Sequence, residues 1–313
     1  MNSFTHENTR LGFIGIGNMG SRIARRLLAH GYQLTAYNRS REAAEALTKY
    51  GATVADSIAE LASEADVILS SLTNDEAVKT VYSDSPGVFA NVRTGSAIIE
   101  MSTVSPSTSR ELHKLSSEAG VKFLDAPVSG STPAAEDGML TLFCGGDEEL
   151  FEAAQPIFSA IAKQNYYLGG SGSGTAMKLV ANTLLGVGMQ AIAESIALGQ
   201  KEGLDRHRLL EVLSHTAVIA PAHLGKLPRA DAGDYSTQFA LRLMNKDFAL
   251  VLETAAAAKV PMPATAAAFQ MNVAQFNASK EEDFSTVITL MERLAGVGTT
   301  DAGNRRVAGN VSS

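Results

Sequence analysis

The feature that most constrains the fold is a glycine pattern near the start of the chain. Gly15, Gly17 and Gly20 follow the spacing G-x-G-x-x-G, directly after an apolar run and directly before a segment with helical periodicity. The first glycine permits a tight turn, the second lets a ligand approach the backbone, and the third lets the helix lie close to the strand. Unpaired N–H groups at the N-terminus of such a helix favour phosphate groups. The pattern predicts a dinucleotide site on a Rossmann-type fold, formed by Gly15, Ile16, Gly17, Asn18, Met19 and Gly20.

Short apolar runs alternate with amphipathic segments over residues 10–127, which is typical of βαβ units that feed a parallel sheet. We expect strands over residues 11–16, 33–37, 67–71, 97–101 and 122–125. We expect helices over residues 21–30, 41–50 and 105–119, each followed by a glycine in the position of a helix C-cap, namely Gly31, Gly51 and Gly120. This half is therefore predicted to be an α/β domain with a doubly wound sheet.

The character of the chain changes after the glycine-rich residues 169–174. Strand signals vanish, and helical runs rich in Ala and Leu follow over residues 175–202, 206–214, 239–259 and 264–277. At 313 residues the chain also exceeds what one core usually serves. We predict a Rossmann domain over residues 1–172 and an all-α domain over residues 173–313, built on a long central helix and ending in a frayed tail from residue 296. That helix is apolar on most faces, so we expect a homodimer or homotetramer.

Composition argues against several partners and compartments. The net charge is −7 and the basic side chains are scattered, so we expect no nucleic-acid partner. The most membrane-like stretch, residues 179–198, is interrupted by Asn182, Gln190 and Glu194, so we expect a buried helix and no membrane contact. The single cysteine, Cys144, lies in an apolar run and is expected to be a buried strand residue. One cysteine and no leader signal in the first ten residues predict a cytoplasmic protein.

The six histidines show no spacing typical of metal ligands, and no cluster of histidine with carboxylates stands out. His215 and His223 are interpreted as surface or loop residues. We therefore expect a reaction without a metal.

The residues after the second predicted strand indicate which dinucleotide is bound. An NAD site usually has an acidic residue there for the ribose 2′-hydroxyl, but this strand runs into Asn38, Arg39 and Ser40. A guanidinium with a neighbouring hydroxyl matches a 2′-phosphate, so we predict NADP with Arg39 as the main selector. The alternative is that Arg39 and Arg41 merely begin a solvated helix.

Several blocks of sequence together resemble the β-hydroxyacid dehydrogenase family, which includes 3-hydroxyisobutyrate dehydrogenases and the glyoxylate/succinic semialdehyde reductases. The blocks are residues 12–20, 101–103, 125–130 and 174–182, followed by Lys246 and Asp247. Many relatives have a second glycine after Gly130, whereas this chain has Ser131, Thr132 and Pro133. That variant resembles the NADP-preferring glyoxylate/succinic semialdehyde reductase branch, although the lysine of that branch after Ser131 is missing.

The resemblance implies that Lys178 is the catalytic residue. When hydride reaches a carbonyl carbon, the oxygen needs a proton from a positioned group, and a lysine whose pKa is lowered by burial can supply it. The alternative is a lysine at a helix start with its head in water. Asn182 lies one helical turn further on the same face, where its amide could orient the ammonium group or the substrate, unless it bonds only to local backbone.

The resemblance also implies roles for residues outside this helix. Ser129, Gly130 and Ser131 correspond to a loop that binds the substrate carboxylate, with an ordinary turn after a strand as the alternative. Thr103 is expected to contact the nicotinamide ribose and the substrate, and Leu72, Thr73 and Lys246 to contact the cofactor. Asp247 is expected to pair with a basic group or help close the site, unless Lys246 and Asp247 are a solvated helix pair.

The sequence thus predicts an NADP-dependent oxidoreductase that transfers hydride between nicotinamide and a small hydroxy acid or its carbonyl partner. A 3-hydroxyisobutyrate-type dehydrogenase differs only in the substrate pocket. Imine reduction is a related possibility, against which Lys178 argues. A protein of another class, a scaffold or NADP sensor without turnover, could dispense with Lys178 and the substrate loop.

Overall fold

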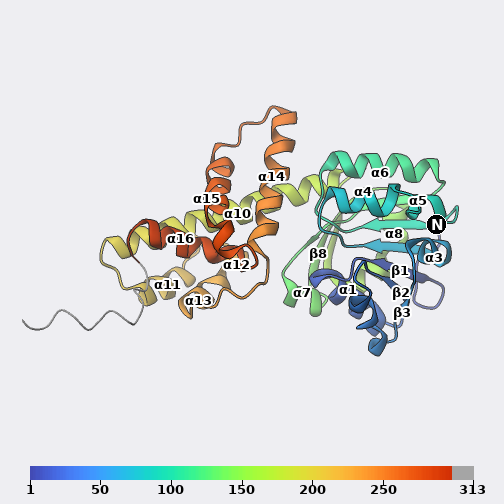
Figure 1. Ribbon diagram of the computed structural model, residues 1–313, viewed down its shortest axis with the longest axis horizontal. Coiled ribbons are helices and arrows are strands. Elements are labelled where there is room, and N and C mark those ends of the chain that lie inside the picture. The colour runs from blue at the N-terminus through green and yellow to red at the C-terminus, as the bar shows by residue number, and fades with distance from the viewer. Residues whose placement is uncertain (298–313) are drawn as a thin grey trace, which may run out of the picture. The chain divides into compact units, whose positions relative to one another are not determined.

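The computed structural model describes residues 1–297 and divides into two compact units, Met1–Val180 and the chain from Ala181 onward. The predicted tail lies outside the described residues from residue 298 onward. The domain boundary predicted at residue 173 coincides with the start of the long helix α10 (Ser173–Lys201), and the two units divide inside this helix. We describe each unit by itself (Figure 1).

The first unit is built on a nine-stranded sheet with the order β3-β2-β1-β4-β5-β6-β8-β7, and β9 pairs with β8. Strands β1 to β6 run parallel in this order, whereas β8 is antiparallel to β6 and β7. The strands are β1 (Arg10–Ile14), β2 (Gln33–Tyr37), β3 (Thr53–Val54), β4 (Val67–Ser70), β5 (Ala97–Glu100), β6 (Lys122–Asp125), β7 (Val128–Ser129), β8 (Leu140–Gly146) and β9 (Ala162–Tyr167). The predicted Rossmann sheet is confirmed.

Helices cover both faces of this sheet, as a doubly wound fold requires (Figure 1). On one face α1 (Asn18–Ala29) packs through Ile23 and Leu27, together with α8 (Glu148–Ala153) and α9 (Gln155–Ile161). The other face is covered by α3 (Ile58–Glu64), α4 (Asp75–Ser83) and α6 (Pro106–Glu118). The strands between them are buried on both sides, which explains their continuous apolar sequence.

The expected strands match β1, β2, β4, β5 and β6 to within two residues at each end, and Cys144 lies buried in β8. The predicted helix over residues 41–50 was wrong in part, because it breaks into α2 (Arg41–Glu45) and a 3-10 turn (Thr48–Tyr50). Thr48 donates its hydroxyl to the Glu45 carbonyl at 2.8 Å, which takes an acceptor from the helical ladder. Helices α3, α4, α8 and α9 and the short helices α5 (Val88–Asn91) and α7 (Thr132–Glu136) were not predicted.

The second unit is helical. After α10 it contains α11 (Arg206–Ser214), α12 (Pro221–Leu224), α13 (Lys226–Asp231), α14 (Leu241–Ala258), α15 (Pro263–Ser279), a 3-10 turn (Phe284–Thr286) and α16 (Val287–Leu294). Its core gathers Met189 and Ile196 of α10, Phe248 of α14 and Ile288 of α16. Within residues 1–297, α10 is the one helix long and apolar enough to cross a membrane, a property that core helices of globular domains share.

The prediction that His223 is a surface or loop residue was wrong. His223 is buried in α12, where its ring nitrogen Nε2 lies 2.9 Å from the Leu185 carbonyl oxygen. The ring fits because residue 188 is glycine, since a Cβ there would stand 2.7 Å from the His223 Cε1 atom. His215 ends α11 and is exposed, as predicted.

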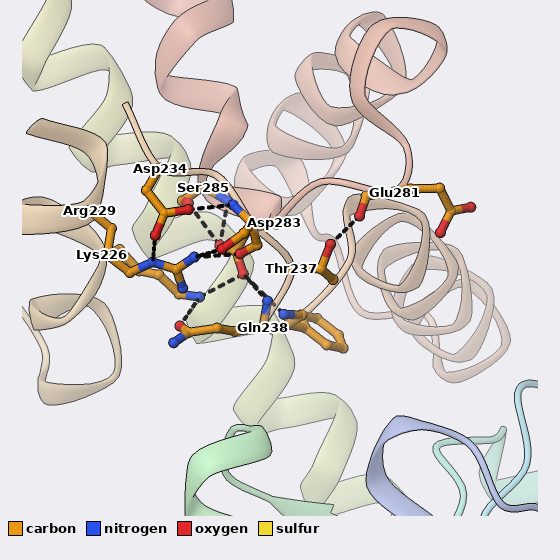
Figure 2. A network of polar contacts seen from close by, with 10 residues as sticks. Lys226, Arg229, Asp234, Thr237, Gln238, Glu281, Asp283 and Ser285 are labelled. Carbon is orange, nitrogen blue, oxygen red and sulfur yellow. Dashed lines mark hydrogen bonds and ion pairs between the residues drawn. The ribbon is translucent and has the colours of Figure 1, made fainter. Parts of the chain in front are cut away.

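A buried carboxylate organises the loop between α13 and α14 (Figure 2). Oδ2 of Asp283 lies 2.7 Å from the Lys226 ammonium and accepts hydrogen bonds from the backbone N–H groups of Gln238 and Phe239. Oδ1 accepts the Ser285 hydroxyl at 2.7 Å. Because Asp283 is 1% exposed, each of these donors replaces water that the carboxylate has lost.

We expect Asp283→Ala to lower the free energy of unfolding of the helical unit by about 3 to 5 kcal/mol, because it leaves the Lys226 ammonium buried without its partner. The matched control is Arg242→Ala, which removes the exposed ion pair with Glu281 and should cost less than about 1 kcal/mol. Urea unfolding followed by helical circular dichroism measures both. Equal small shifts in the two variants would show that Asp283 does not organise this unit.

Candidate active site

The predicted site residues of the first unit follow the ends of neighbouring parallel strands. The last residues of these strands stand in register: Ile14 pairs with both Tyr37 and Ser70, Ser70 with Glu100, and Glu100 with Asp125. The segments after them carry residues 15–20, Asn38, Arg39, Ser40, Leu72, Thr73, Thr103, Ser129, Gly130 and Ser131. The fold therefore brings all of these segments to the carboxyl edge of one sheet, where ligands of open α/β folds bind.

The three glycines have the separate geometries that their spacing predicts. Gly15 has φ of +94°, and a Cβ there would stand 2.3 Å from the Ser71 carbonyl oxygen. A Cβ at Gly20 would lie 2.0 Å from the Gly15 oxygen, so the start of α1 touches the turn. At Gly17 no atom lies within 4 Å of the Cβ position. Gly15 and Gly20 are thus required by the fold itself, whereas Gly17 leaves open space beside the backbone.

The N-terminus of α1 borders this open space. No side chain caps the helix in the structure, and its first turn holds no acidic residue. The first N–H groups of a helix lack intrahelical acceptors and carry positive potential. The turn and the helix start are therefore suited to hold the pyrophosphate of a dinucleotide.

Asn38 links the glycine turn to the turn after β2. Its Oδ1 accepts a hydrogen bond from the Ile16 N–H at 2.9 Å, and its Nδ2 donates to the Ser40 carbonyl oxygen at 2.9 Å. The glycine turn (residues 15–17), predicted to hold phosphate, and the turn after β2 (residues 38–40), here called the selector turn, are consequently connected by one amide side chain.

The two arginines of the selector turn differ in their surroundings. Arg41 lies 2.8 Å from Glu45 and 2.5 Å from Asp56, and these partners raise the pKa of its guanidinium. Arg39 is exposed and makes no hydrogen bond or ion pair with the residues that the structure describes. Of the two, Arg39 is the one with donors available for a phosphate.

Glu100 supports the two turns on either side of its strand. Its Oε1 accepts the Ser102 N–H at 2.6 Å, and the Ser102 hydroxyl in turn accepts the Leu72 N–H at 2.7 Å. The Ser70 hydroxyl donates to Oε2 and is also hydrogen-bonded to the Tyr82 hydroxyl at 2.6 Å. Burial raises the pKa of Glu100 to about 7. The positions of Leu72 and of the segment leading to Thr103 therefore depend on one buried acid.

Asp125 makes a similar connection from the end of β6. Its Oδ1 accepts the Gly172 N–H at 2.7 Å and its Oδ2 accepts the Thr175 N–H at 2.8 Å, at the start of α10. Burial raises the pKa of this carboxyl to about 6, against the opposite effect of the two N–H groups. Lys178 follows Thr175 on the same helix, so the strand end and the helix that carries the predicted catalytic lysine are joined directly.

The remaining predicted residues belong to the helical unit. Asn182 lies four positions after Lys178 on α10, and its Nδ2 is 2.5 Å from Oδ2 of Asp247 on α14. The other carboxylate oxygen of Asp247 is 2.9 Å from the Lys246 ammonium. Both Asn182 and Asp247 are almost fully buried. Asp247 thus lies beside the ammonium of the adjacent Lys246, and the Asn182 amide has a partner on another helix; the roles assigned to these residues stay predictions.

Sequence reasoning assigned no role to Glu100, Ser102 or the carboxylate of Asp125. A signal was present, because Glu100 and Asp125 are acidic residues that end apolar strands, and a buried acid must find donors. Among residues 1–297, no group of three or more His, Cys, Asp or Glu side chains is placed to hold a metal ion.

Comparison with known proteins identifies the family. The profile of the NAD binding domain of 6-phosphogluconate dehydrogenase matches residues 10–169. The profile described as NAD-binding of NADP-dependent 3-hydroxyisobutyrate dehydrogenase matches residues 172–291. The chain is also 36% identical to 2-(hydroxymethyl)glutarate dehydrogenase of Eubacterium barkeri, over 93% of this chain and 97% of that one. The chain belongs to the β-hydroxyacid dehydrogenase family.

Other members of this family are similar over nearly the whole chain. Glyoxylate/succinic semialdehyde reductase 1 of Arabidopsis thaliana is 35% identical, over 89% of this chain and 96% of the relative. The solved structure of 3-hydroxyisobutyrate dehydrogenase from Mycobacterium tuberculosis with L-serine has a TM-score of 0.83 and 31% identity, covering 90% of this chain and 99% of that one. The chain is accordingly an NAD(P)-dependent hydroxyacid dehydrogenase.

The open space at Gly17 gives a direct test of the cofactor site. We expect Gly17→Ala to fold with a slightly lower melting temperature, since alanine is a poorer N-cap of α1 than glycine, and to bind NADPH at least about tenfold more weakly, because the methyl group enters ligand space and meets no protein atom. Fluorescence titration measures the affinity. Gly225→Ala is the control, since its Cβ also has no neighbour within 4 Å but lies in the helical unit. Wild-type NADPH affinity in Gly17→Ala would place the dinucleotide elsewhere.

Proposed function

We propose that this enzyme is an NADP-dependent reductase of small aldehyde or keto acids, reversible toward the hydroxy acid, with Lys178 as the general acid and base. The observation that carries the proposal is the connection at the start of α10. This helix holds Lys178 one turn beyond the Thr175 N–H that Asp125 binds, at the carboxyl edge of the sheet that carries the glycine turn. A proton donor is thereby fixed relative to the strand ends.

The proton chemistry rests on residues of this chain. When bound, the reduced nicotinamide supplies a hydride to the carbonyl carbon of the substrate. The Lys178 ammonium then donates a proton to the developing alkoxide, and it recovers that proton when the reaction runs toward the carbonyl. Asn182 is a positioning residue in this scheme, because its buried amide is held by Asp247 and stands one turn from Lys178 on α10.

The substrate class is supported by the loop after β6. Ser129 pairs with Thr141 in the β7–β8 ladder, so its place at the strand end is fixed. Gly130 has φ of +136° and packs against Leu140, where a Cβ would lie 2.8 Å from the Leu140 Cδ2 atom. The Ser129 hydroxyl and the N–H groups of Gly130 and Ser131 would bind a carboxylate without another bulky charge. Glyoxylate and succinic semialdehyde, after which two of the relatives are named, fit this requirement.

The preference for NADP is supported by the contrast between Arg39 and Arg41. Arg39 has its guanidinium donors available and stands beside Ser40, whose hydroxyl does not cap α2. A guanidinium with a hydroxyl is suited to a 2′-phosphate, which carries charge that the ribose of NAD lacks.

We expect Arg39→Ala to raise the KM for NADPH by about 10-fold to 100-fold, since it removes charge-assisted hydrogen bonds to the 2′-phosphate, while activity with NADH stays close to that of the wild type. Arg41→Ala is the matched control, because Glu45 and Asp56 already occupy that guanidinium. Steady-state assays with both dinucleotides measure the effect. Equal losses in the two variants, or an equal loss with NADH, would contradict the selector role of Arg39.

We expect Lys178→Ala to lower kcat by at least about 10²-fold without weakening NADPH binding, because the alkoxide loses its proton donor. Lys201→Ala, at the far end of the same helix, is the control and should keep wild-type kcat. Loss of NADPH absorbance is followed with glyoxylate, succinic semialdehyde, tartronate semialdehyde and methylmalonate semialdehyde. Tight NADPH binding by the wild type without turnover of any of them would favour a sensor, and undiminished turnover by Lys178→Ala would exclude the lysine as the acid.

A further inference from the structure

The carboxylate of Asp125 is fully buried and points at the beginning of α10. It accepts the N–H groups of Gly172 and Thr175 at 2.7 and 2.8 Å, and the Ser171 hydroxyl lies 3.4 Å from Oδ1. These three donors come from consecutive parts of the turn that leads into the helix. One carboxylate therefore holds both the turn and one N–H group of the first turn of α10, that of Thr175.

Two glycines let the backbone lie close to this carboxylate. A Cβ at Gly145 would stand 3.0 Å from its Oδ1, and a Cβ at Gly174 would stand 2.9 Å from its Oδ2. The same Cβ at Gly174 would lie 2.2 Å from the Phe143 carbonyl oxygen, so the helix start is also pressed against β8. Residues 145 and 174 must therefore be glycine for the start of α10 to lie this close to β8 and to the Asp125 carboxylate.

Asp125 also stands next to the segment that carries the substrate loop. It is the last residue of β6, and only Ala126 and Pro127 separate it from β7, which ends at Ser129. On the helix side, Lys178 lies three positions beyond Thr175 and thus one turn from the hydrogen bond. A single side chain therefore bridges the two segments whose separation decides where a proton meets a bound carbonyl.

We propose that Asp125 is a positioning residue for the reaction, which sets the Lys178 ammonium against the loop formed by Ser129, Gly130 and Ser131. The inference rests on the proposed role of Lys178 as the general acid. If Asp125 had only a structural role, replacing it would change the stability of the first unit and leave both kcat and KM of the folded enzyme unaltered. A positioning role changes the rate of the chemical step, because catalysis depends on reacting atoms being held in a near-attack arrangement.

The test compares Asp125→Asn with a matched variant of another carboxylate that accepts a backbone N–H group, that of Asp147, the N-cap residue of α8. In Asp125→Asn one oxygen is replaced by an NH₂ group that faces a backbone N–H, so one of the two hydrogen bonds to α10 is lost. Asp147→Asn is the control, because Asp147 accepts the Phe123 N–H at 2.9 Å near the beginning of β6, away from α10. We measure kcat, KM, NADPH affinity, melting temperature, and the isotope effect on kcat with NADPH deuterated at nicotinamide C4.

We expect Asp125→Asn to lower kcat by up to about 10²-fold, with a larger isotope effect, a smaller change in KM and unchanged NADPH affinity. Asp147→Asn should lower the melting temperature and keep the wild-type kcat and isotope effect. A wild-type kcat in Asp125→Asn, or equal losses of kcat in both variants, would overturn the proposal. If Asp125→Asn does not fold, Asp125→Glu is judged by the same criteria, since its longer side chain keeps the charge but displaces the helix start.

Lys178→Ala, measured in parallel, separates the two levels of the account. If Lys178→Ala keeps wild-type turnover, Lys178 is not the general acid, and the positioning role of Asp125 fails with it, whatever Asp125→Asn does. If Lys178→Ala loses turnover while Asp125→Asn keeps it, only the positioning role of Asp125 fails.

Discussion

Glu100 and Asp125, two buried acids on adjacent strands, hold the loops at the carboxyl edge of the sheet in place. They end adjacent strands in register, and neither is exposed. A carboxylate removed from water must be hydrogen-bonded, and the nearest donors belong to the segments that leave the sheet. Glu100 therefore holds the turns of Ser102 and Leu72 through hydrogen bonds, and Asp125 holds the start of α10 in the same way. Burial raises the pKa of Glu100 to about 7 and that of Asp125 to about 6, although the hydrogen bonds to both carboxylates act in the opposite direction.

The same edge separates positions set by the fold from positions left for a ligand. Gly15 and Gly20 are in contact with protein backbone, Asp125 and Asn38 are fully engaged, and Arg41 is paired with two carboxylates. Gly17 and the N-terminus of α1 face open space, and Arg39 has no partner among the described residues. The groups left available are suited to a pyrophosphate and to a 2′-phosphate, which supports the proposed NADP, whereas the family shows NAD(P) dependence alone.

The sequence predicted the parts of the structure that depend on local pattern. The buried parallel strands are continuous apolar runs, and the roles of Gly15, Gly17 and Gly20 follow from a turn and a helix that are adjacent in the chain. It could not predict interactions between distant segments. The partners of Asp125 are 47 and 50 positions away in the sequence. Asn182 and Asp247, which are hydrogen-bonded to each other, are 65 positions apart. His223 was predicted wrongly for the same reason, because its ring packs against Gly188, a residue of another helix that is distant in the sequence.

The proposed reductase activity is tested most directly by following the hydride from the nicotinamide to the product. The enzyme is incubated with glyoxylate or succinic semialdehyde and with NADPH that carries deuterium at both nicotinamide C4 positions, and the product is analysed by mass spectrometry and NMR. If the enzyme is a reductase, we expect a hydroxy acid with one deuterium on the carbinol carbon. Bound and unconsumed NADPH with no labelled hydroxy acid, at saturating carbonyl, would contradict it.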